Sequence, residues 1–412
     1  TELPIYQKSA PRTPDGSFSY SYTLSDDERE AHAIWSNGTN YNIAFNYNEF
    51  GDLIKEDRPN LGGQSRDTEY LYDTMGNRTA IVWPDGWTAR YVYDDMGRLY
   101  RVWADPNGNG TCASQPNACG DGFATYAGTG DYRLAQYEYD TLNRVTAIIF
   151  GGSTSNPVSR IDYTYDDDGD LASEAHTFST SSNVTLTHTY DKSGKLISTQ
   201  SSDPTWLYNP GVDQIVDYGA ANTLDQYPSV NGEMLAYDAN GNMRTAPSGA
   251  VYTHTSDNQL ETASVSGTTT TYRYDARGRP VLKDVGGTKT HFIHAGDMEI
   301  AEMDNSGTIT VRYVPGAGID QRVAMVVGST RHYYHPDRLG NVIAMVDNSG
   351  VVTDQYLYTP FGVQAPFAAS GNPFRYTGQL GWGAGNVPTG RAGIAQKRPD
   401  WRGWVRRFAI EA

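Results

Sequence analysis

The sequence predicts an all-β protein in which one short β-hairpin recurs many times and neighbouring hairpins join into a long curled sheet. A short segment returns about every twenty to twenty-five residues, a period typical of one supersecondary unit per repeat. The composition favours strands and tight turns, with 30 Tyr and 43 Gly among 412 residues. No long segment shows the apolar periodicity of a helix.

The repeat reads aromatic, any residue, Tyr-Asp, two or three variable residues, Gly followed by Asn or Arg, and then an apolar residue. The clear copies are YLYDTMGNRT from Tyr70, YVYDDMGRLY from Tyr91, YEYDTLNRVT from Tyr137, YTYDDDGDLA from Tyr163, HTYDKSGKLI from His188, LAYDANGNMR from Leu235 and YRYDARGRPV from Tyr272. Weaker copies are FNYNEFGDLI from Phe45, YTHTSDNQLE from Tyr252 and EMDNSGTITV from Glu302.

Each part of the repeat has a structural reason. Alternation puts Tyr91 and Tyr93 on one face of a strand. The Asp that follows bonds to amides ahead of it, Gly accepts a positive φ, and Leu99 opens the next strand. One hairpin alone is at best marginally stable, so neighbours must pair edge to edge, and a long twisted sheet curls. We therefore expect one continuous curled sheet whose tyrosines pack between hairpins and place their hydroxyls on polar partners.

The charge of the chain limits its partners. Asp and Glu number 48 against 32 Lys and Arg, so the formal net charge is −16. This balance argues against nucleic acid or an anionic membrane as a partner. No run of eighteen apolar residues is present, so we expect no transmembrane helix. The segment TELPIYQKSA lacks the apolar core of a signal peptide and looks like the start of a fragment or of a mature product.

Both cysteines lie in an insertion at residues 104–122, which is rich in Pro, Asn and Gly. Cys112 and Cys119 bracket a short polar loop, and we predict a disulfide between them that stabilises by roughly 2 to 3 kcal/mol. A disulfide indicates an oxidising compartment, and we expect the protein to be secreted or to lie at the cell surface. Zinc is a poor alternative because two further Cys or His ligands are missing nearby.

The same insertion begins like a calcium loop. Asp105, Asn107 and Asn109, followed by Gly110, fit the first half of the D-x-N-x-N-G pattern. Position twelve is Pro116, where a bidentate acid belongs. Calcium is therefore a weak cofactor candidate, and the sequence indicates no other cofactor.

Three further segments carry a family resemblance. They are HAGDMEIAEMDNSGTITVRYVPGAGID from His294, YYHPDRLGNVIAMVDNSGVVTDQYLYTPFG from Tyr333 and NPFRYTGQ from Asn372. Together with the Tyr-Asp repeats they resemble the C-terminal half of an RHS core, also called a YD-repeat core, over residues 40–379. The block around Asp337, Leu339 and Gly340 is the most specific part of the resemblance.

The resemblance implies a hollow β-shell over residues 1–379. In this family such a shell encloses a C-terminal payload in polymorphic toxins and toxin complexes, and serves adhesion in teneurin-like proteins. We therefore expect an exported scaffold that encloses or presents a payload or another part of a larger parent protein. A partial shell would leave an open edge strand at each end, which favours edge-to-edge self-association.

The tail at residues 380–412 departs from the family pattern. The family continues with a tyrosine-rich stretch and a DPxGxxxG segment whose aspartates support self-cleavage, but this chain reads LGWGAGNVPTGRAGIAQKRPDWRGWVRRFAIEA. Two interpretations stay open: a cap that packs Trp382, Trp401 and Trp404 on the shell, or an ending produced by a shifted reading frame. In either case the self-cleavage aspartates cannot be assigned.

An enzyme is the second functional hypothesis. The chain contains no G-x-S-x-G, S-x-x-K, H-E-x-x-H or phosphate-binding Gly-Lys loop. The densest set of groups for acid/base work or metal binding is His332, Tyr334, His335 and Asp337, with Tyr333 among them. These residues could belong to a secreted lyase or hydrolase that uses Tyr and His on a polysaccharide; the simpler interpretation is that they are strand and turn residues of the scaffold.

A carbohydrate-binding or adhesive module is the third hypothesis, because a concave surface lined with tyrosines suits stacking of sugars. For the enzyme hypothesis, paired acids such as Asp94 with Asp95, or Asp166 to Asp168, could also serve as catalytic groups that cleave glycans. Adjacent carboxylates on a strand point to opposite faces, so these acids are more simply explained as turn residues.

Overall fold

The computed structural model describes residues 18–24, 29–35, 43–108, 131–208, 217–246, 249–255, 258–275, 277–318, 320–358, 364–365 and 370–374. The described residues form an all-β fold, as predicted, and their only helical element is the short 3-10 helix η4 (Pro204–Trp206). No helix in the described part of the chain has the length and apolar character needed to cross a membrane.

The first sheet has fourteen strands, each antiparallel to its neighbour and ordered as in the sequence. Its strands are β1 (Phe18–Leu24), β2 (Arg29–Trp35), β3 (Ile43–Tyr47), β4 (Leu53–Asp57), β5 (Thr68–Tyr72), β6 (Arg78–Val82), β7 (Thr88–Tyr93), β8 (Leu99–Asp105), β9 (Tyr132–Tyr139), β10 (Val145–Phe150), β11 (Ser159–Tyr165), β12 (Leu171–Phe178), β13 (Val184–Tyr190) and β14 (Leu196–Ser201).

The second sheet has thirteen strands, again in sequence order. Its strands are β17 (Ala236–Tyr237), β18 (Met243–Thr245), β19 (Val251–His254), β20 (Leu260–Val265), β21 (Thr268–Tyr274), β22 (Pro280–Val285), β23 (Thr288–Ala295), β24 (Met298–Met303), β25 (Ile309–Pro315), β26 (Arg322–Val327), β27 (Thr330–Pro336), β28 (Val342–Asp347) and β29 (Val352–Gln355). Two short pairs, β15 (Ser229–Val230) with β16 (Glu233–Met234) and β30 (Leu357–Tyr358) with β31 (Gln364–Ala365), stand apart from it.

The expectation of one continuous sheet is therefore corrected to two long sheets. They are separated between β14 and β17, where the sequence leaves the repeat pattern. This stretch contains Pro204 and Pro228, which cannot donate a backbone hydrogen bond to a neighbouring strand. The loss of the repeat explains why the sheet stops and a new one begins.

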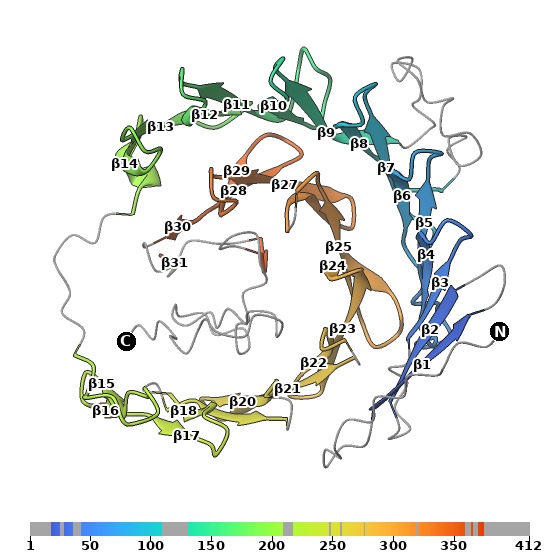
Figure 1. Cartoon of the computed structure of the whole chain (residues 1–412), viewed down its shortest axis with the longest axis vertical. Helices are drawn as coiled ribbons and strands as arrows, with labels where there is room; N and C mark the ends of the chain where they lie inside the picture. Colours follow the sequence, from blue (N-terminus) through green and yellow to red (C-terminus); the bar gives the residue numbers. More distant parts are fainter. Residues whose placement is uncertain are drawn as a thin grey trace.

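The two sheets curl into a spiral with two layers over part of its length. In Figure 1 the strands of the first sheet follow an outer arc, and β23 to β29 turn back inside that arc. Hydrogen bonds join the layers: Arg58 Nη2 donates to the carbonyl of His294 at 3.0 Å, and the hydroxyl of Tyr91 donates to the carbonyl of Pro315 at 3.3 Å. The second half of the second sheet is thus an inner layer that lines the first.

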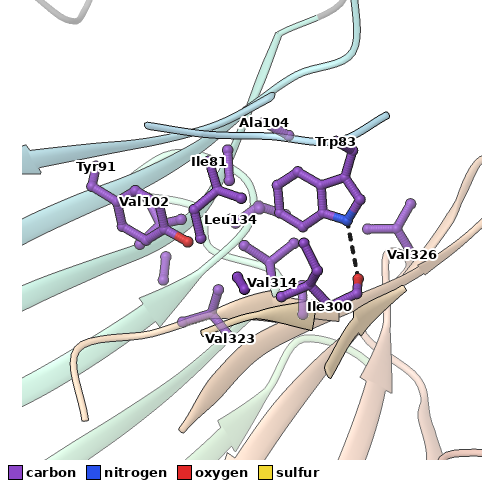
Figure 2. Close-up of a cluster of buried hydrophobic side chains, with 14 of the residues drawn as sticks. Ile81, Trp83, Tyr91, Val102, Ala104, Leu134, Ile300, Val314, Val323 and Val326 are labelled. Carbon is purple, nitrogen blue, oxygen red and sulfur yellow. Dashed lines mark hydrogen bonds between the residues drawn. The ribbon is translucent and has the colours of Figure 1, made fainter. Parts of the chain in front are cut away.

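The main hydrophobic core lies between these layers. Its buried residues come from the outer strands, such as Ile81, Val102 and Leu134, and from the inner strands, such as Val314 and Val326. Figure 2 shows these side chains interleaved, with the indole of Trp83 pointing across the gap. The Trp83 indole N–H donates to the carbonyl of Ile300 at 3.0 Å. Burial of this apolar surface is what holds the inner layer in place.

A buried ion cluster adds a second contact between the layers. Glu56 on β4 is fully buried and accepts hydrogen bonds from Arg58 Nη2 at 2.5 Å, Arg279 Nη1 at 3.0 Å, the Tyr70 hydroxyl at 2.7 Å and the Gly296 amide at 2.6 Å. Glu56 lies on the first sheet, whereas Arg279 and Gly296 belong to the second. The Glu56 carboxylate therefore joins the two sheets.

The turn of each repeat is built by its Asp. The Oδ1 of Asp94 accepts the amides of Met96 at 3.0 Å and Arg98 at 2.9 Å, while Oδ2 accepts Arg98 Nε at 2.7 Å. Gly97 has a φ of 75°, as the turn requires. The same amide pattern recurs at Asp73, Asp140, Asp166, Asp191, Asp238, Asp275, Asp304, Asp337 and Asp347.

The tyrosine before this Asp joins one hairpin to the previous one. Its hydroxyl donates to the carbonyl of the residue that opens the preceding strand, at 2.7–3.0 Å. The pairs are Tyr72 with Leu53, Tyr93 with Arg78, Tyr139 with Leu99, Tyr165 with Val145, Tyr190 with Leu171 and Tyr274 with Leu260. The prediction that the tyrosines pack between hairpins and satisfy their hydroxyls is confirmed for these six tyrosines.

Candidate functional site

Strand β27 carries most of the residues that the sequence singles out for chemistry. Tyr333 is buried in the core between the layers, whereas Tyr334 belongs to a separate cluster on the opposite face of the inner sheet. By the alternation of a strand, His335 shares the face of Tyr333 and His332 shares the face of Tyr334. The candidate residues are therefore divided between two faces of one strand and do not converge on one point.

Asp337 lies in the turn after β27 and acts as the other repeat aspartates do. Its Oδ1 accepts the amides of Leu339 at 2.8 Å and Asn341 at 2.9 Å, and its Oδ2 accepts the Asn341 side-chain amide at 2.7 Å. Burial raises the pKa of this carboxyl, against the opposing effect of these hydrogen bonds. Turn formation accounts for its position in the chain.

His332 is half-buried, and burial lowers the pKa of its ring. Its Nδ1 lies 3.3 Å from the hydroxyl of Thr353 on β29, which is separated from β27 by β28. The assignment of His332, Tyr334, His335 and Asp337 to acid/base chemistry stays a prediction, and so do the hypotheses of a polysaccharide lyase or hydrolase and of a glycan-binding module.

His335 is fully buried between the layers. Its Nδ1 lies 3.2 Å from Nδ1 of His176 on β12, and its Nε2 lies 2.8 Å from the Ser159 hydroxyl on β11. The rings of Phe150 and Phe178 lie 4.9 and 5.0 Å from the imidazole of His335. The sequence could not indicate this pair, because 159 residues separate the two histidines.

Tyr334 faces the inner side of the spiral, where it holds a late segment of the chain. Its hydroxyl donates to the side-chain oxygen of Asn372 at 2.9 Å. Two residues on, the ring of Phe374 lies edge-on to Tyr313 with 4.6 Å between centroids, and the Arg322 guanidinium lies 3.3 Å from its centroid. Asn372 and Phe374 are both buried. This contact holds residues 372–374 against the inner face.

Charged side chains gather beside this segment, and sequence reasoning missed them. Glu302 accepts the Tyr313 hydroxyl at 2.6 Å. Glu299 is fully enclosed, and neither of its carboxylate oxygens has a hydrogen-bond donor among the described residues. Burial first, and then the charge of Glu302, raise the pKa of Glu299 well above its usual range. The signal in the sequence was MEIAEM on β24, where two acids interrupt an apolar strand.

Burial also shifts the other groups of this cluster. It lowers the pKa of Arg322 and raises that of Tyr334 well above its usual value. Residues 370–374 contact the inner face through three interactions. The Tyr334 hydroxyl donates to Asn372 at 2.9 Å, the Ser370 amide donates to Asp354 at 2.8 Å, and the Arg322 guanidinium lies over the ring of Phe374.

The calcium and disulfide predictions fall mainly outside the described residues. Asp105 is buried, and its Oδ2 accepts Arg90 Nη2 at 2.7 Å. Asn109, Cys112 and Cys119 lie outside the described residues. Calcium binding and the disulfide therefore stay predictions. In the part of the chain that the structure describes, no group of three or more His, Cys, Asp or Glu side chains could hold a metal ion.

The fold and the inner face define a class of protein: a curled shell of Tyr-Asp hairpins whose concave side holds a late segment of its own chain. Comparison with known families agrees. The family model described as Teneurin YD-shell matches residues 132–380, more than half of the chain. The chain belongs to this family, so the predicted resemblance to RHS and YD-repeat proteins is confirmed.

Known relatives are much larger proteins. A protein of Bacillus spizizenii described as tRNA3(Ser)-specific nuclease WapA is 25% identical over 86% of this chain. The tRNA nuclease WapA of Bacillus subtilis is also 25% identical over 86% of this chain, and mouse Teneurin-1 is 26% identical over 55% of it. The chain spans 14% of the length of the two WapA proteins and 8% of Teneurin-1.

Among solved structures, one titled "Crystal Structure of TcdB2-TccC3-Cdc42" is 17% identical and matches with a TM-score of 0.40. The match covers 89% of this chain and 21% of that one. By its sequence this chain is an RHS-type YD-shell region, similar to a part of the much larger WapA proteins and of Teneurin-1.

Proposed function

We propose that this chain is a section of a shell that encloses a C-terminal payload. The observation that carries the proposal is the position of residues 370–374 on the inner face, held by the Tyr334–Asn372 hydrogen bond and by the burial of Phe374. Phe374, the last residue that the structure describes, packs with Tyr334 on the concave side of the spiral. A domain that followed would begin inside the shell.

The layered construction supports a container. The inner layer is joined to the outer one by the hydrophobic core and by the Glu56 cluster. A wall of this kind resists opening at one hairpin, because each hairpin is held by its neighbours and by the opposite layer. The WapA relatives are named as tRNA nucleases, and a payload that acts on nucleic acid would suit a shell that keeps it apart until release.

The proposal also includes the expectations from the sequence about export, the extent of the shell and its partners. The parent protein is exported to an oxidising compartment, the shell extends to residue 379, and the partners are the payload and the rest of the parent. Residues 380–412 lie outside the described residues, and both interpretations of them, a cap and a shifted frame, stay open.

The test is protection from protease within the complete natural protein that contains this chain. Proteinase K is added under native conditions, and the polypeptide that follows residue 374 is followed by mass spectrometry. We expect it to survive as long as the shell stays folded. Asn372→Ala combined with Phe374→Ala should expose it, whereas Asn240→Ala in an exposed turn should not. If this polypeptide is digested rapidly while the shell itself stays intact, the payload is not enclosed and the proposal is refuted.

A further inference from the structure

Two histidines meet at the contact between the layers. His176 comes from β12 of the outer layer and His335 from β27 of the inner layer, with 3.2 Å between their Nδ1 atoms. Such a contact needs a proton on one Nδ1 and a lone pair on the other. Only one of the two Nδ1 atoms can therefore carry a proton while the layers are in contact, because protons on both would set two N–H groups against each other.

The surroundings offer little to stabilise a charge. Phe150, Phe178 and the partner ring enclose the imidazole of His335, and its other nitrogen contacts the Ser159 hydroxyl. The Nε2 of His176 has no hydrogen-bond partner among the described residues. A buried cation without a partner is costly, so a proton added to either ring favours separation of the layers.

Titratable groups on the neighbouring elements also affect how the contact between the layers depends on pH. Glu174 shares the inward face of β12, and its Oε1 lies 3.5 Å from Nε2 of His188 on β13. From the inner layer, the turn after β27 brings Asp337 and Arg338 toward Glu174. On β10 and β11 the facing residues are Phe150 and Ser159, neither of which titrates in this range.

We propose that His176 and His335 form an acid-sensitive latch between the outer and the inner layer, which is closed while both rings are neutral and opens when they take up a proton. The latch depends only on the contact between the layers. It does not require that the shell enclose another segment, so it can be tested apart from the proposed function.

The direction of the effect follows from the two states. Burial lowers the pKa of His176 to about 3, and burial together with His176 lowers the pKa of His335 well below its usual value. In an open state each ring returns toward about 6.5. The open state thus binds more protons, and the closed state is lost as the pH falls below about 6.5, by about tenfold per pH unit for each histidine.

Two acids act in the opposite direction. Burial raises the pKa values of Glu174 and Asp337, so each takes up a proton more readily in the closed state and favours closure as the pH falls. Wild type and a histidine variant both keep Glu174 and Asp337. The contribution of these acids therefore cancels when the pH responses of the two proteins are compared.

Hydrogen exchange of residues 330–347, corrected for the intrinsic rate at each pH, measures opening. The wild-type chain is compared with His176→Phe/His335→Phe at pH 7.5 and pH 5.5. Relative to this variant, we expect opening of wild type to rise about tenfold if one histidine titrates and up to about a hundredfold if both do. His254→Phe replaces a histidine on β19, outside the measured segment, whose pKa burial also lowers; it is the matched control and should keep the wild-type response.

Equal pH responses in wild type and in the double variant would overturn the latch, and so would loss of the response in His254→Phe. If the double variant does not fold, as judged by circular dichroism at pH 7.5, the single variant His335→Gln replaces it. That variant should lose at least half of the logarithmic response, and an unchanged response would again overturn the proposal.

Discussion

The hydroxyl of Tyr165 donates a hydrogen bond of 2.8 Å to the carbonyl oxygen of Val145, and this contact joins two consecutive hairpins of the outer layer. Val145 opens β10 and Tyr165 closes β11, so the bond lies at the boundary between one repeat and the next. Because the same contact recurs along the array, the second tyrosine of each of these repeats joins its hairpin to the previous one.

Replacement of Tyr165 by Phe removes this bond and keeps the ring. We expect a loss of about 0.5 to 1.5 kcal/mol in the free energy of unfolding, the usual net contribution of one hydrogen bond. Urea denaturation followed by circular dichroism measures it. Tyr208→Phe, at an exposed tyrosine, should change the stability by less than about 0.5 kcal/mol. Equal effects at the two sites would contradict the fastening role.

Replacement of Glu56 by Gln should be among the most damaging single changes. It removes the charge that compensates the buried guanidinium groups of Arg58 and Arg279. Breaking a buried ion pair on one side typically costs about 3 to 5 kcal/mol. Denaturant unfolding measures the loss, and Glu69→Gln at an exposed position of β5 is the control. A loss below about 1 kcal/mol would contradict the role of this cluster.

The same carboxylate predicts a pH dependence. Burial raises the pKa of Glu56, but Arg58, Arg279, Tyr70 and the Gly296 amide outweigh burial and leave it lowered. Its contribution to stability is therefore present above about 4.5, the usual value, and is lost as the pH falls through the folded pKa. Thermal unfolding between pH 5 and pH 3 should show a steeper loss in wild type than in Glu56→Gln, and parallel curves would contradict this.

Substitution of Gly62 tests whether the two layers touch at the turn that contains it. Its φ is 58°, and a Cβ atom there would collide with the carbonyl oxygen of Ser306 on the inner layer. Gly63 has a φ of 82°, but a Cβ atom there meets nothing within 4 Å. Both Ala variants carry backbone strain, so Gly62→Ala should cost about 1 to 3 kcal/mol more than Gly63→Ala in denaturant unfolding. Equal costs would mean that the turns do not touch.

Tyr334→Phe tests the hold on the late segment. Loss of the bond to Asn372, worth about 1 kcal/mol, should raise local opening of residues 370–374 about fivefold. Trypsin cleavage at Arg375 under native conditions measures this opening. Tyr333→Phe, on the other face of the strand, should leave the cleavage rate unchanged. If both variants are cut alike, Tyr334 does not hold the segment.

Local features of the fold could be predicted from the sequence. The Asp-x-x-Gly turns, the strand that Leu99 opens and the burial of the repeat tyrosines all follow from interactions within one hairpin or between neighbours. The site could be predicted only in part. The segment of Tyr334 and His335 was singled out, but its division between two faces was overlooked, and Glu299, Glu302 and Arg322 gave no recognised signal.

The hairpin and its repetition follow from the sequence alone, because period-two alternation and turn chemistry act over fewer than about ten residues. The break of the sheet near β14, the packing of the inner layer on the outer one and the contact of His176 with His335 arise at the level of tertiary structure. These contacts depend on the accumulated twist and curl of many strands, a sum of small angles that no single repeat specifies. The partners across the gap are therefore set by the global path of the sheet.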